Sequence, residues 1–269
     1  MKRVYFLCFF FLSDFICYAQ NNLKIQYALH YVVDTSNLNQ IKHEKFSLFI
    51  SENNYSCFLS NVTIYNDSVL KSLEKVPLSL GIINNTKSLP FKNTGFDWII
   101  SKNRDLNKIS IYDKIGKISG KYDFDIVLDW EILDSTRIIE NYNCILAKTQ
   151  YAGRNYYSWF CPELPISDGP YIFSGLPGLI MEISDTKMHY SFKILSIEKY
   201  SIPVLNPYFS ESRATSFKRA DFLNMRKQRQ KDPINYIENS LNIKSLDLST
   251  KEQIIKNMAR KNNYIEMDW

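Results

Sequence analysis

Alternating apolar and polar residues predict β-strands along most of the chain. In residues 23–33, five large apolar side chains share one face of an extended segment: Leu23, Ile25, Tyr27, Leu29 and Tyr31. Residues 43–51 repeat the pattern, with Phe49 on the face opposite three other apolar residues. A period of two is typical of a half-buried strand. The same criterion predicts strands at residues 55–59, 96–100, 108–112, 117–128, 130–134, 141–151, 154–160, 179–183 and 187–197.

Helices are predicted mainly near the end of the chain. Residues 215–231 contain neither proline nor glycine, and residues 233–240 begin with a proline, which suits the first turn of a helix. Ser249 and Glu252 have the spacing of a capping box for a third helix. An earlier, short helix is predicted at residues 68–75, with Asp67 as its N-cap.

The order of these elements predicts the fold class. Strands followed by helices, without regular alternation of the two, favour an α+β fold. Residues 84–95 are polar and predict a loop, and residues 113–116 predict a turn. Because no repeat and no low-complexity linker is present, a single domain is expected over residues 20–269.

A stretch rich in proline and glycine interrupts the strands at residues 159–183. It holds four of the nine prolines and three of the eight glycines of the chain. Proline fixes φ and glycine permits positive φ, so the path of the backbone is closely specified here. Leu176-Pro-Gly-Leu179 has the residues of a type II turn, and Ser167-Asp-Gly-Pro170 predicts another turn. At Gly175, the lack of a side chain leaves room for a large neighbour.

The first 19 residues have the pattern of a signal peptide. Two basic residues precede the apolar run Val4–Leu12, and Ala19 offers a small residue for cleavage. The run is shorter than the ~20 apolar residues of a membrane-spanning helix. We therefore expect export to the periplasm or cell envelope, with no transmembrane segment after cleavage.

Composition agrees with an exported β-rich protein. Hydrophobic residues make up 45% of the chain, with 18 tyrosines and 17 phenylalanines, which suit half-buried sheet surfaces. Removing residues 1–19 changes the formal net charge from +5 to only +4, because two basic residues and one acidic residue leave. So mild a charge argues against nucleic acid as a partner.

Three cysteines remain after cleavage: Cys57, Cys144 and Cys161. An odd number leaves at least one thiol outside any intramolecular disulfide. No CxxC spacing is present, which argues against a zinc site or a redox dithiol. A Cys144–Cys161 disulfide would need their strands to be neighbours, and small buried hydrophobes are the preferred interpretation.

Several stretches resemble the GLPGLI family. Gly175-Leu-Pro-Gly-Leu-Ile180 is the sequence for which that family is named. The surroundings are similar too, with Tyr142-Asn-Cys144, Gly153-Arg154 and Pro165–Tyr171 before the motif and Asn262–Glu266 near the end. In the family, proline usually stands at the position of Tyr264.

The resemblance implies a fold and a compartment, and it leaves the activity open. The family looks like exported envelope proteins of Bacteroidota-type bacteria with no assigned biochemical role. It is similar to the bowl-shaped N-terminal domain of one type of peptide:N-glycanase, and to LolA-like half-barrels. These folds are curved antiparallel sheets with a concave apolar face and helices mainly at the C-terminus. Asn141 and Cys161 depart from the family pattern, where glycine and threonine are usual. Fold similarity alone does not establish function.

The sequence lacks the common motifs of zinc sites, serine hydrolases and cysteine enzymes. Its three histidines, His30, His43 and His189, lack the zincin spacing, and His30 alternates with apolar residues as a sheet residue would. Ser174 precedes a glycine but lacks the first glycine of a Gly-x-Ser-x-Gly elbow. Cys161 has no local basic cluster to activate its thiol. We therefore expect no catalytic residue, metal ligand or cofactor.

Acidic and basic groups suggest two weaker alternatives. Glu163, Asp168 and Glu182 could supply a carboxylate pair for a hydrolase, or for an accessory domain that acts on glycans or peptides. Asp168 stands before Gly169, however, and is expected to bond within its own turn. The basic residues of segment 213–231 favour a solvated helix face over binding to anionic lipid.

These observations predict a non-catalytic binding or carrier module with a hydrophobic ligand or lipid, or an outer-membrane protein partner. Gly175, Leu176, Pro177 and Gly178, with Asp168 and Gly169, are expected to be structural. The residues predicted to form the concave binding face are Trp159, Tyr171, Phe173, Leu176 and Met181.

Overall fold

The computed structural model describes residues 22–52, 54–74, 89–200 and 214–266. The predicted signal peptide and part of the predicted 84–95 loop lie outside these ranges. Within them, the chain forms twelve strands and four helices. The strands are β1 Leu23–Val32, β2 Ile41–Ile50, β3 Tyr55–Ser60, β4 Ile99–Asn103, β5 Lys108–Ile115, β6 Ile118–Asp125, β7 Glu131–Ile139, β8 Tyr142–Tyr151, β9 Arg154–Cys161, β10 Leu179–Asp185, β11 Tyr190–Lys199 and β12 Thr215–Ser216. The helices are α1 Asn61–Glu74, α2 Arg219–Lys231, α3 Pro233–Leu241 and α4 Leu248–Ala259.

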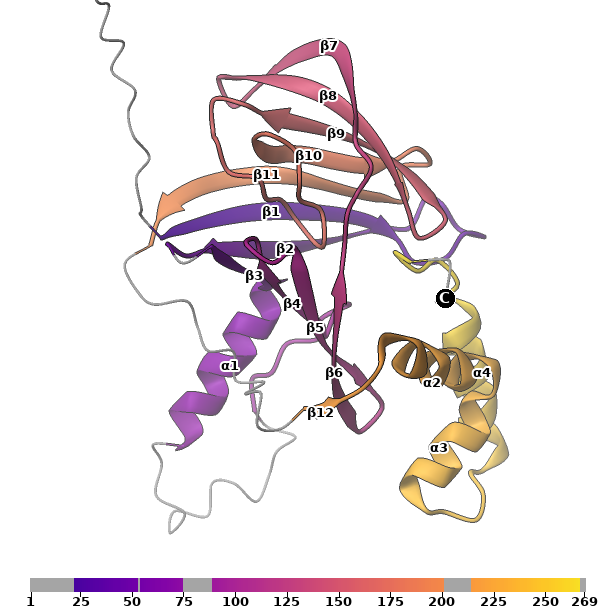
Figure 1. The fold of residues 1–269 in the computed structure, drawn as a ribbon. Helices are drawn as coiled ribbons and strands as arrows, with labels where there is room; N and C mark the ends of the chain where they lie inside the picture. Colours follow the sequence, from indigo (N-terminus) through magenta and orange to yellow (C-terminus); the bar gives the residue numbers. More distant parts are fainter. Residues whose placement is uncertain (1–21, 53, 75–88, 201–213, 267–269) are drawn as a thin grey trace, which may run out of the picture.

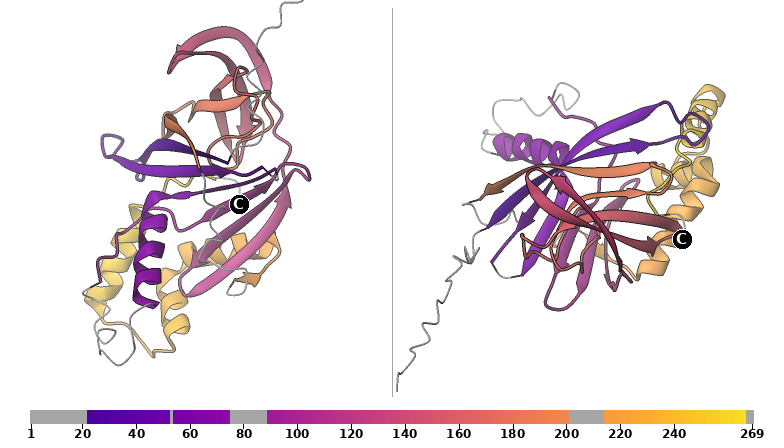
Figure 2. Two further views of the ribbon diagram at one scale, coloured as in Figure 1. Left: turned by 90° about the vertical axis from the view of Figure 1, so that its left-hand side faces the viewer. Right: turned by 90° about the horizontal axis from the view of Figure 1, so that it is seen from above.

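All of the described strands belong to one open sheet, in the order β12-β6-β5-β4-β3-β2-β1-β11-β10-β9-β8-β7. Strands β1 to β6 form one meander and β7 to β11 another, and antiparallel pairing of β1 with β11 joins them. Every described pairing is antiparallel except that of β12 with β6. Figures 1 and 2 show that the sheet is strongly curved. The predicted α+β fold with a curved antiparallel sheet is therefore confirmed.

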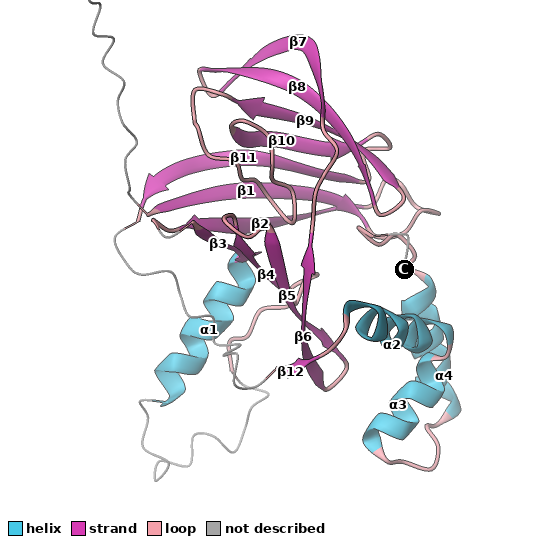
Figure 3. Ribbon diagram, in the orientation of Figure 1, coloured by secondary structure: helices cyan, strands magenta, loops and turns pink. Residues whose placement is uncertain are grey.

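Three of the described helices follow the strands, as predicted. Figure 3 shows α2, α3 and α4 together at one end of the sheet, with α1 apart from them. The α2 side chain of Phe222 packs against Tyr122 of β6, with ring centroids 5.3 Å apart. No helix in the described part of the chain is long and apolar enough to cross a membrane.

The two faces of the first meander form separate cores. The alternating residues of β1 are buried in the main core, on the concave face. Phe49 points to the other face, as its position predicted, and packs in a smaller core with Cys57 and Ile99. Ile64 of α1 packs against this second core. Helix α1 therefore covers the back of the sheet.

The proline- and glycine-rich corner, residues 162–178, fills much of the concave side. Its side chains Tyr171 and Phe173 are buried in the main core. Trp98, from the first meander, lies with its ring centroid 5.2 Å from that of Tyr171, and Tyr156, from the second, lies 4.7 Å from Phe173. The corner thus packs between the two meanders rather than only bounding a hollow.

A buried ion pair fixes this corner to the first meander. Lys102 of β4 places its Nζ 2.6 Å from Oδ1 of Asp168 and donates to the carbonyl oxygens of Gly169 at 2.7 Å and Phe173 at 3.4 Å. The Asp168 carboxylate also accepts from the Gly169 amide at 2.8 Å, the local bond expected from the sequence. Lys102 is 2% exposed and Asp168 is fully buried. Burial lowers the pKa of Lys102, and the charge of Asp168 partly offsets that effect.

The Gly-Leu-Pro-Gly stretch differs from its predicted type II turn. The Gly178 amide donates to the Leu176 carbonyl at 2.8 Å, and the Leu179 amide donates instead to Leu164 at 3.0 Å. A bond between residues two apart defines a γ-turn around the proline. Glycine is needed at 178 because a Cβ there would lie 2.1 Å from the Cys161 carbonyl oxygen.

Several predicted boundaries were wrong. Asp67 lies inside α1, where it pairs with Lys71 at 2.8 Å, and the helix begins six residues earlier. The N-cap of α4 is Asp247, which accepts from the amide of Thr250, so the predicted capping box does not form. The predicted turn at 113–116 is mostly strand β5, and the predicted helix at 215 starts as strand β12.

Candidate functional site

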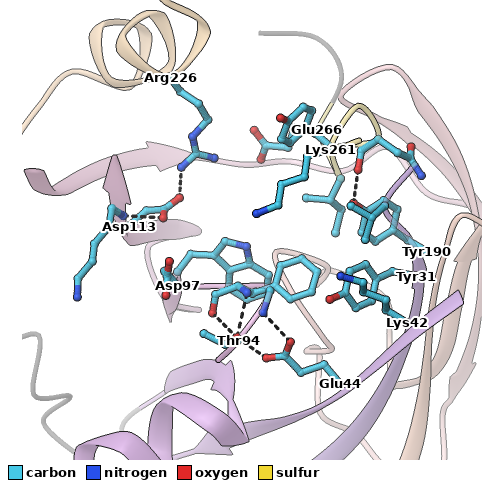
Figure 4. Close-up of a pocket in the computed structure, with 18 of the residues that line it drawn as sticks. Tyr31, Lys42, Glu44, Thr94, Asp97, Asp113, Tyr190, Arg226, Lys261 and Glu266 are labelled. Atoms are coloured by element: carbon cyan, nitrogen blue, oxygen red, sulfur yellow. Dashed lines mark hydrogen bonds and ion pairs between the residues drawn. The ribbon is translucent and has the colours of Figure 1, made fainter. Parts of the chain in front are cut away.

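A cavity of about 640 Å³ opens on the concave side, between the first meander, the corner, α2 and residues 258–266 (Figure 4). Its lining combines aromatic rings with charged groups of both signs. The aromatic lining residues include Tyr31, Phe96, Trp98, Tyr122, Tyr171, Tyr190 and Tyr264. The charged ones include Lys42, Glu44, Asp97, Asp113, Lys114, Arg226, Arg229, Lys261 and Glu266.

The aromatic floor is a contiguous set of rings from three parts of the chain. Tyr31 of β1 contacts Phe96 edge to face, with centroids 4.8 Å apart. Phe96 and Trp98 are 5.3 Å apart, and Trp98 continues to Tyr171 of the corner. All four residues are buried, so their neighbours hold the rings in place.

The C-terminal segment, residues 262–266, forms one wall and is held by a buried arginine. Arg154, at the start of β9, pairs with Asp185 at 2.9 Å. Its guanidinium also donates to the side-chain oxygen of Asn263 at 2.5 Å and to the carbonyl of Ile265 at 3.1 Å. Two stretches that the sequence analysis quoted separately, Gly153-Arg154 and Asn262–Glu266, are therefore in direct contact.

Glu266 joins this segment to the corner. Its Oε1 accepts from the hydroxyls of Tyr171 at 2.7 Å and Tyr151 at 2.8 Å. Arg219 of α2 lies 3.5 Å from the other carboxylate oxygen. Burial, together with the nearby negative charge of Glu266, raises the pKa of Tyr171 well above its ordinary value. Tyr171 therefore stays a neutral hydrogen-bond donor.

Two arginines of helix α2, Arg226 and Arg229, line the cavity. Arg226 forms an ion pair with the buried Asp113 of β5, and Arg219 lies seven residues earlier, on the same face of the helix. The prediction that this basic run is simply a solvated face was therefore wrong for Arg219 and Arg226, and Arg213 of the run lies outside the described residues. Three lysines of this basic run are exposed: Lys218, Lys227 and Lys231.

Two lysines of the cavity lining differ from the ion-paired arginines of α2 in their lack of an ion-pair partner among the described residues. Lys42 and Lys261 have no carboxylate within ion-pair distance among the residues that the structure describes. In Figure 4, the amine of Lys261 points into the cavity. Glu44, by contrast, accepts hydrogen bonds from Ser60, Thr94 and the amide of Gly95. The lysines are therefore available to an anionic group of a ligand.

One of the five predicted ligand-binding residues, Tyr171, lines this cavity. Trp159 lies outside the lining, half-buried, with the guanidinium of Arg137 stacked 4.5 Å from its ring centroid. The other three are buried in the main core: Phe173, Leu176 and Met181. Ligand contact by these residues stays a prediction.

The candidate hydrolase carboxylates do not converge. Asp168 is bonded to Lys102, Glu163 accepts from the Asn143 amide at 2.9 Å, and Glu182 pairs with Arg137. Within the described residues, no three His, Cys, Asp or Glu side chains gather in a way that could hold a metal ion.

The serine and histidine candidates have structural partners. The carbonyl of Ser174 accepts from the Trp130 indole at 2.8 Å, which explains the large neighbour expected at Gly175. His30 and His43 face each other across β1 and β2, with ring centroids 4.5 Å apart.

Sequence reasoning missed Arg154, Lys102 and Glu266. A signal was present for the first two, because each falls on the buried face of its strand. Arg154 alternates with Tyr156, and Lys102 with Ile100. A charge at such a position predicts a buried partner. Glu266 lies in the stretch 262–266, which was noted only because it resembles a family pattern. Nothing in the local sequence indicated that Glu266 would bond to Tyr151 and Tyr171.

A family described as "Protein of unknown function (Porph_ging)" matches residues 152–182, from the β8–β9 turn through the corner into β10. No curated protein sequence matches the chain. The C2 crystal form of PNGF-II is similar, with a TM-score of 0.56 and 13% identity, over 79% of this chain and 34% of that one. The P21 form gives 0.52 and 14%, over 76% and 33%.

The chain thus spans about one third of PNGF-II, and at this identity the likeness concerns the fold alone. A LolA superfamily protein from Nitrosomonas europaea gives a TM-score of 0.28 and 8% identity, over 68% of this chain and 88% of that one. The matched family segment contains the Gly175–Ile180 motif, and membership of the GLPGLI family stays a prediction.

Proposed function

We propose that the chain is an exported binding module that holds an amphipathic ligand, with a planar or apolar part and an anionic group, in the cavity beside residues 262–266. The observation that carries the proposal is the combination of a buried aromatic floor with two lysines that lack carboxylate partners among the described residues. Export itself rests on the signal-peptide pattern of residues 1–19.

The size and rigidity of the cavity support binding. Ligand sites typically enclose 300–1,000 Å³ and are largely formed before the ligand arrives, and the volume here is about 640 Å³. Two of its walls are fixed by buried ion pairs, Arg154 with Asp185 and Lys102 with Asp168. Preorganised walls reduce the entropy that a protein loses on binding.

The mixed lining narrows the ligand class. Planar or apolar groups stack favourably on aromatic rings, which Trp98 and Tyr171 provide here. A wholly apolar lipid would leave the charged groups of the lining desolvated without a partner, which is unfavourable. An anionic group near Lys42 and Lys261 would supply that partner. Among the hydrophobic ligands and lipids expected from the sequence, we therefore favour an amphiphile.

A matched pair of fluorescent probes tests this proposal. 1-Anilinonaphthalene-8-sulfonate carries a planar apolar system and a sulfonate, and N-phenyl-1-naphthylamine has the same rings without the charge. We expect saturable one-to-one binding of the first probe to the folded protein, and weaker binding of the second. The measurement is a fluorescence titration of each probe at low ionic strength, where exposed charges are least screened.

Variants locate the site. Replacing both Lys42 and Lys261 by Gln should weaken the affinity for the sulfonate probe by about 3- to 10-fold, as expected for the loss of exposed charge contacts. The affinity for the neutral probe should stay unchanged. Lys199→Gln is the control, because Lys199 is exposed at the far end of β11, outside the lining. Equal effects of the control and the double variant, or unsaturable binding of both probes, would contradict the proposal.

A further inference from the structure

Cys144 of β8 and Cys161 of β9 face each other across two neighbouring strands. Ile145 is opposite Phe160 in the antiparallel register, so the next pair in that register is residue 144 with residue 161. Directly opposed residues of antiparallel strands have Cα atoms about 4.5–5.5 Å apart. Disulfides span Cα separations of 4.4–6.8 Å. The Cα separation expected from this register therefore lies within the range that a disulfide spans.

The two thiols lie in the same buried environment. Both side chains are fully buried in the main core, and the structure holds both as free cysteines. The Cys144 thiol lies 3.6 Å from the Tyr142 carbonyl oxygen, and the two thiols are near enough for each to influence the pKa of the other. Cys57, the third described cysteine, lies in the smaller core on the other face of the sheet. Only one pairing of the three is therefore sterically available.

We propose that Cys144 and Cys161 form a disulfide when the chain folds in the presence of a low-molecular-weight disulfide such as oxidised glutathione. One cysteine thiolate attacks the glutathione disulfide, releases one glutathione thiol and forms a mixed disulfide. The second cysteine then attacks the protein sulfur of that mixed disulfide and releases the other glutathione. The two protein thiols lose two electrons and two protons, and one oxidised glutathione becomes two reduced molecules.

Burial determines when the bond can form. It raises the pKa of the Cys144 thiol to about 12, and it raises the pKa of Cys161 as well. Exchange requires a thiolate and access to the attacking reagent, and the folded, reduced protein offers little of either. Oxidation therefore occurs while the strands assemble, and slowly once folding is complete.

The bond would secure the entry to the corner. Strand β8 has only β7, the sheet edge, on its far side. Cys161 is the last residue of β9, and its carbonyl accepts from Leu164 in the corner at 3.2 Å. A disulfide here ties the outer strands to the segment that carries the Gly175–Ile180 motif.

Peptide mapping after oxidative refolding tests the proposal. The full chain is unfolded in guanidinium with a reductant, refolded with reduced and oxidised glutathione, alkylated with N-ethylmaleimide and digested with trypsin without reduction. Mass spectrometry should detect residues 138–148 joined to residues 155–187, with Cys57 alkylated. Detection of both Cys144 and Cys161 as alkylated thiols would overturn the proposal.

Thermal unfolding gives a second readout. The oxidised protein should melt about 5–10 °C above the same protein after reduction, the shift typical of a disulfide closing a short loop. Cys57→Ala, the matched control, should keep that difference, whereas Cys144→Ala and Cys161→Ala should lose it. An unchanged difference in the Cys161→Ala variant would contradict the assignment. If that variant fails to fold, the peptide map of the wild-type chain still decides.

Discussion

Replacing Lys102 by methionine removes the cation from the buried ion pair that fixes the corner. Lys102 Nζ lies 2.6 Å from Asp168, and it also donates to the carbonyls of Gly169 and Phe173. The side chains of the pair are 3% and 0% exposed. The change therefore leaves a buried carboxylate and two carbonyl groups without this donor.

The expected loss is about 3–5 kcal/mol in the free energy of unfolding, the range for breaking a buried ion pair from one side. Arg104, whose Nη1 lies 3.7 Å from the second oxygen of Asp168, compensates part of the charge, so the lower end applies. Urea denaturation followed by circular dichroism measures the loss. Adding Asp168→Asn to the Lys102→Met variant should recover part of it, because the uncompensated charge is then gone.

Lys108→Met is the matched control. Lys108 lies on the adjacent strand and pairs with Asp123 at 3.3 Å, but its side chain is 45% exposed. Exposed pairs contribute at most about 1 kcal/mol. If Lys102→Met cost no more than Lys108→Met, the claim that this ion pair fixes the corner would be refuted.

Three further predictions concern the turn, the core and a helix cap. Gly178→Ala should lower the free energy of unfolding by about 1–3 kcal/mol, because the added methyl group overpacks against the Cys161 carbonyl. An unchanged urea midpoint would contradict this prediction, since it would show that the backbone of the corner can move to accommodate the methyl group. Burial raises the pKa of Tyr122 above its ordinary value of 10. The unfolded chain therefore ionises first, and stability falls as pH rises above 10. Tyr122→Phe should reduce that fall by about 1 kcal/mol between pH 10 and 11, as measured in urea titrations; an equal fall in both proteins would contradict the prediction. Hydrogen bonds from Ser249 and Thr250 hold the pKa of Asp247 well below its ordinary 3.8. The contribution of this cap to helix stability should therefore be present above pH 3.8 and lost as pH falls towards the lowered pKa. In the Asp247→Asn variant, the protection of α4 amides from hydrogen exchange should no longer depend on pH in this range. An equal acid dependence in the variant and the wild type would contradict the prediction.

Local patterns predicted the strands well, because each strand must bury one face. The alternation of residues 23–33 predicted β1 almost to the residue. Helix α1 was predicted too short, since Val62, Thr63 and Ile64 are β-branched and have weak helix propensity. The packing of Ile64 on the second core stabilises that first turn, and such tertiary contacts do not register in local propensity.

The corner was predicted as structural from its prolines and glycines, yet its position inside the bowl was not. That position depends on Lys102, which lies 66 residues before Asp168 in the chain. Its one local signal is a lysine on the same strand face as Trp98 and Ile100. The type II turn failed for a related reason, because Leu164 takes the Leu179 amide that would have closed it.

The cavity could not be predicted, since its walls come from distant parts of the chain. Tyr31, Trp98, Arg226 and Glu266 belong to four different segments. Aromatic content suggested a receptive face, and Tyr171 is the predicted ligand-binding residue that lies in the cavity. Which rings remain accessible depends on how the corner and the C-terminal segment fill the concave side.

Fluorine NMR of the protein labelled with 5-fluorotryptophan tests the central claim most directly. Each tryptophan gives one resonance, assigned by substituting each in turn with phenylalanine. Titration with 1-anilinonaphthalene-8-sulfonate should shift the resonance of Trp98, which lines the cavity, and leave that of Trp159, which stacks with Arg137 outside it. A shift of Trp159 with no change at Trp98 would contradict the account.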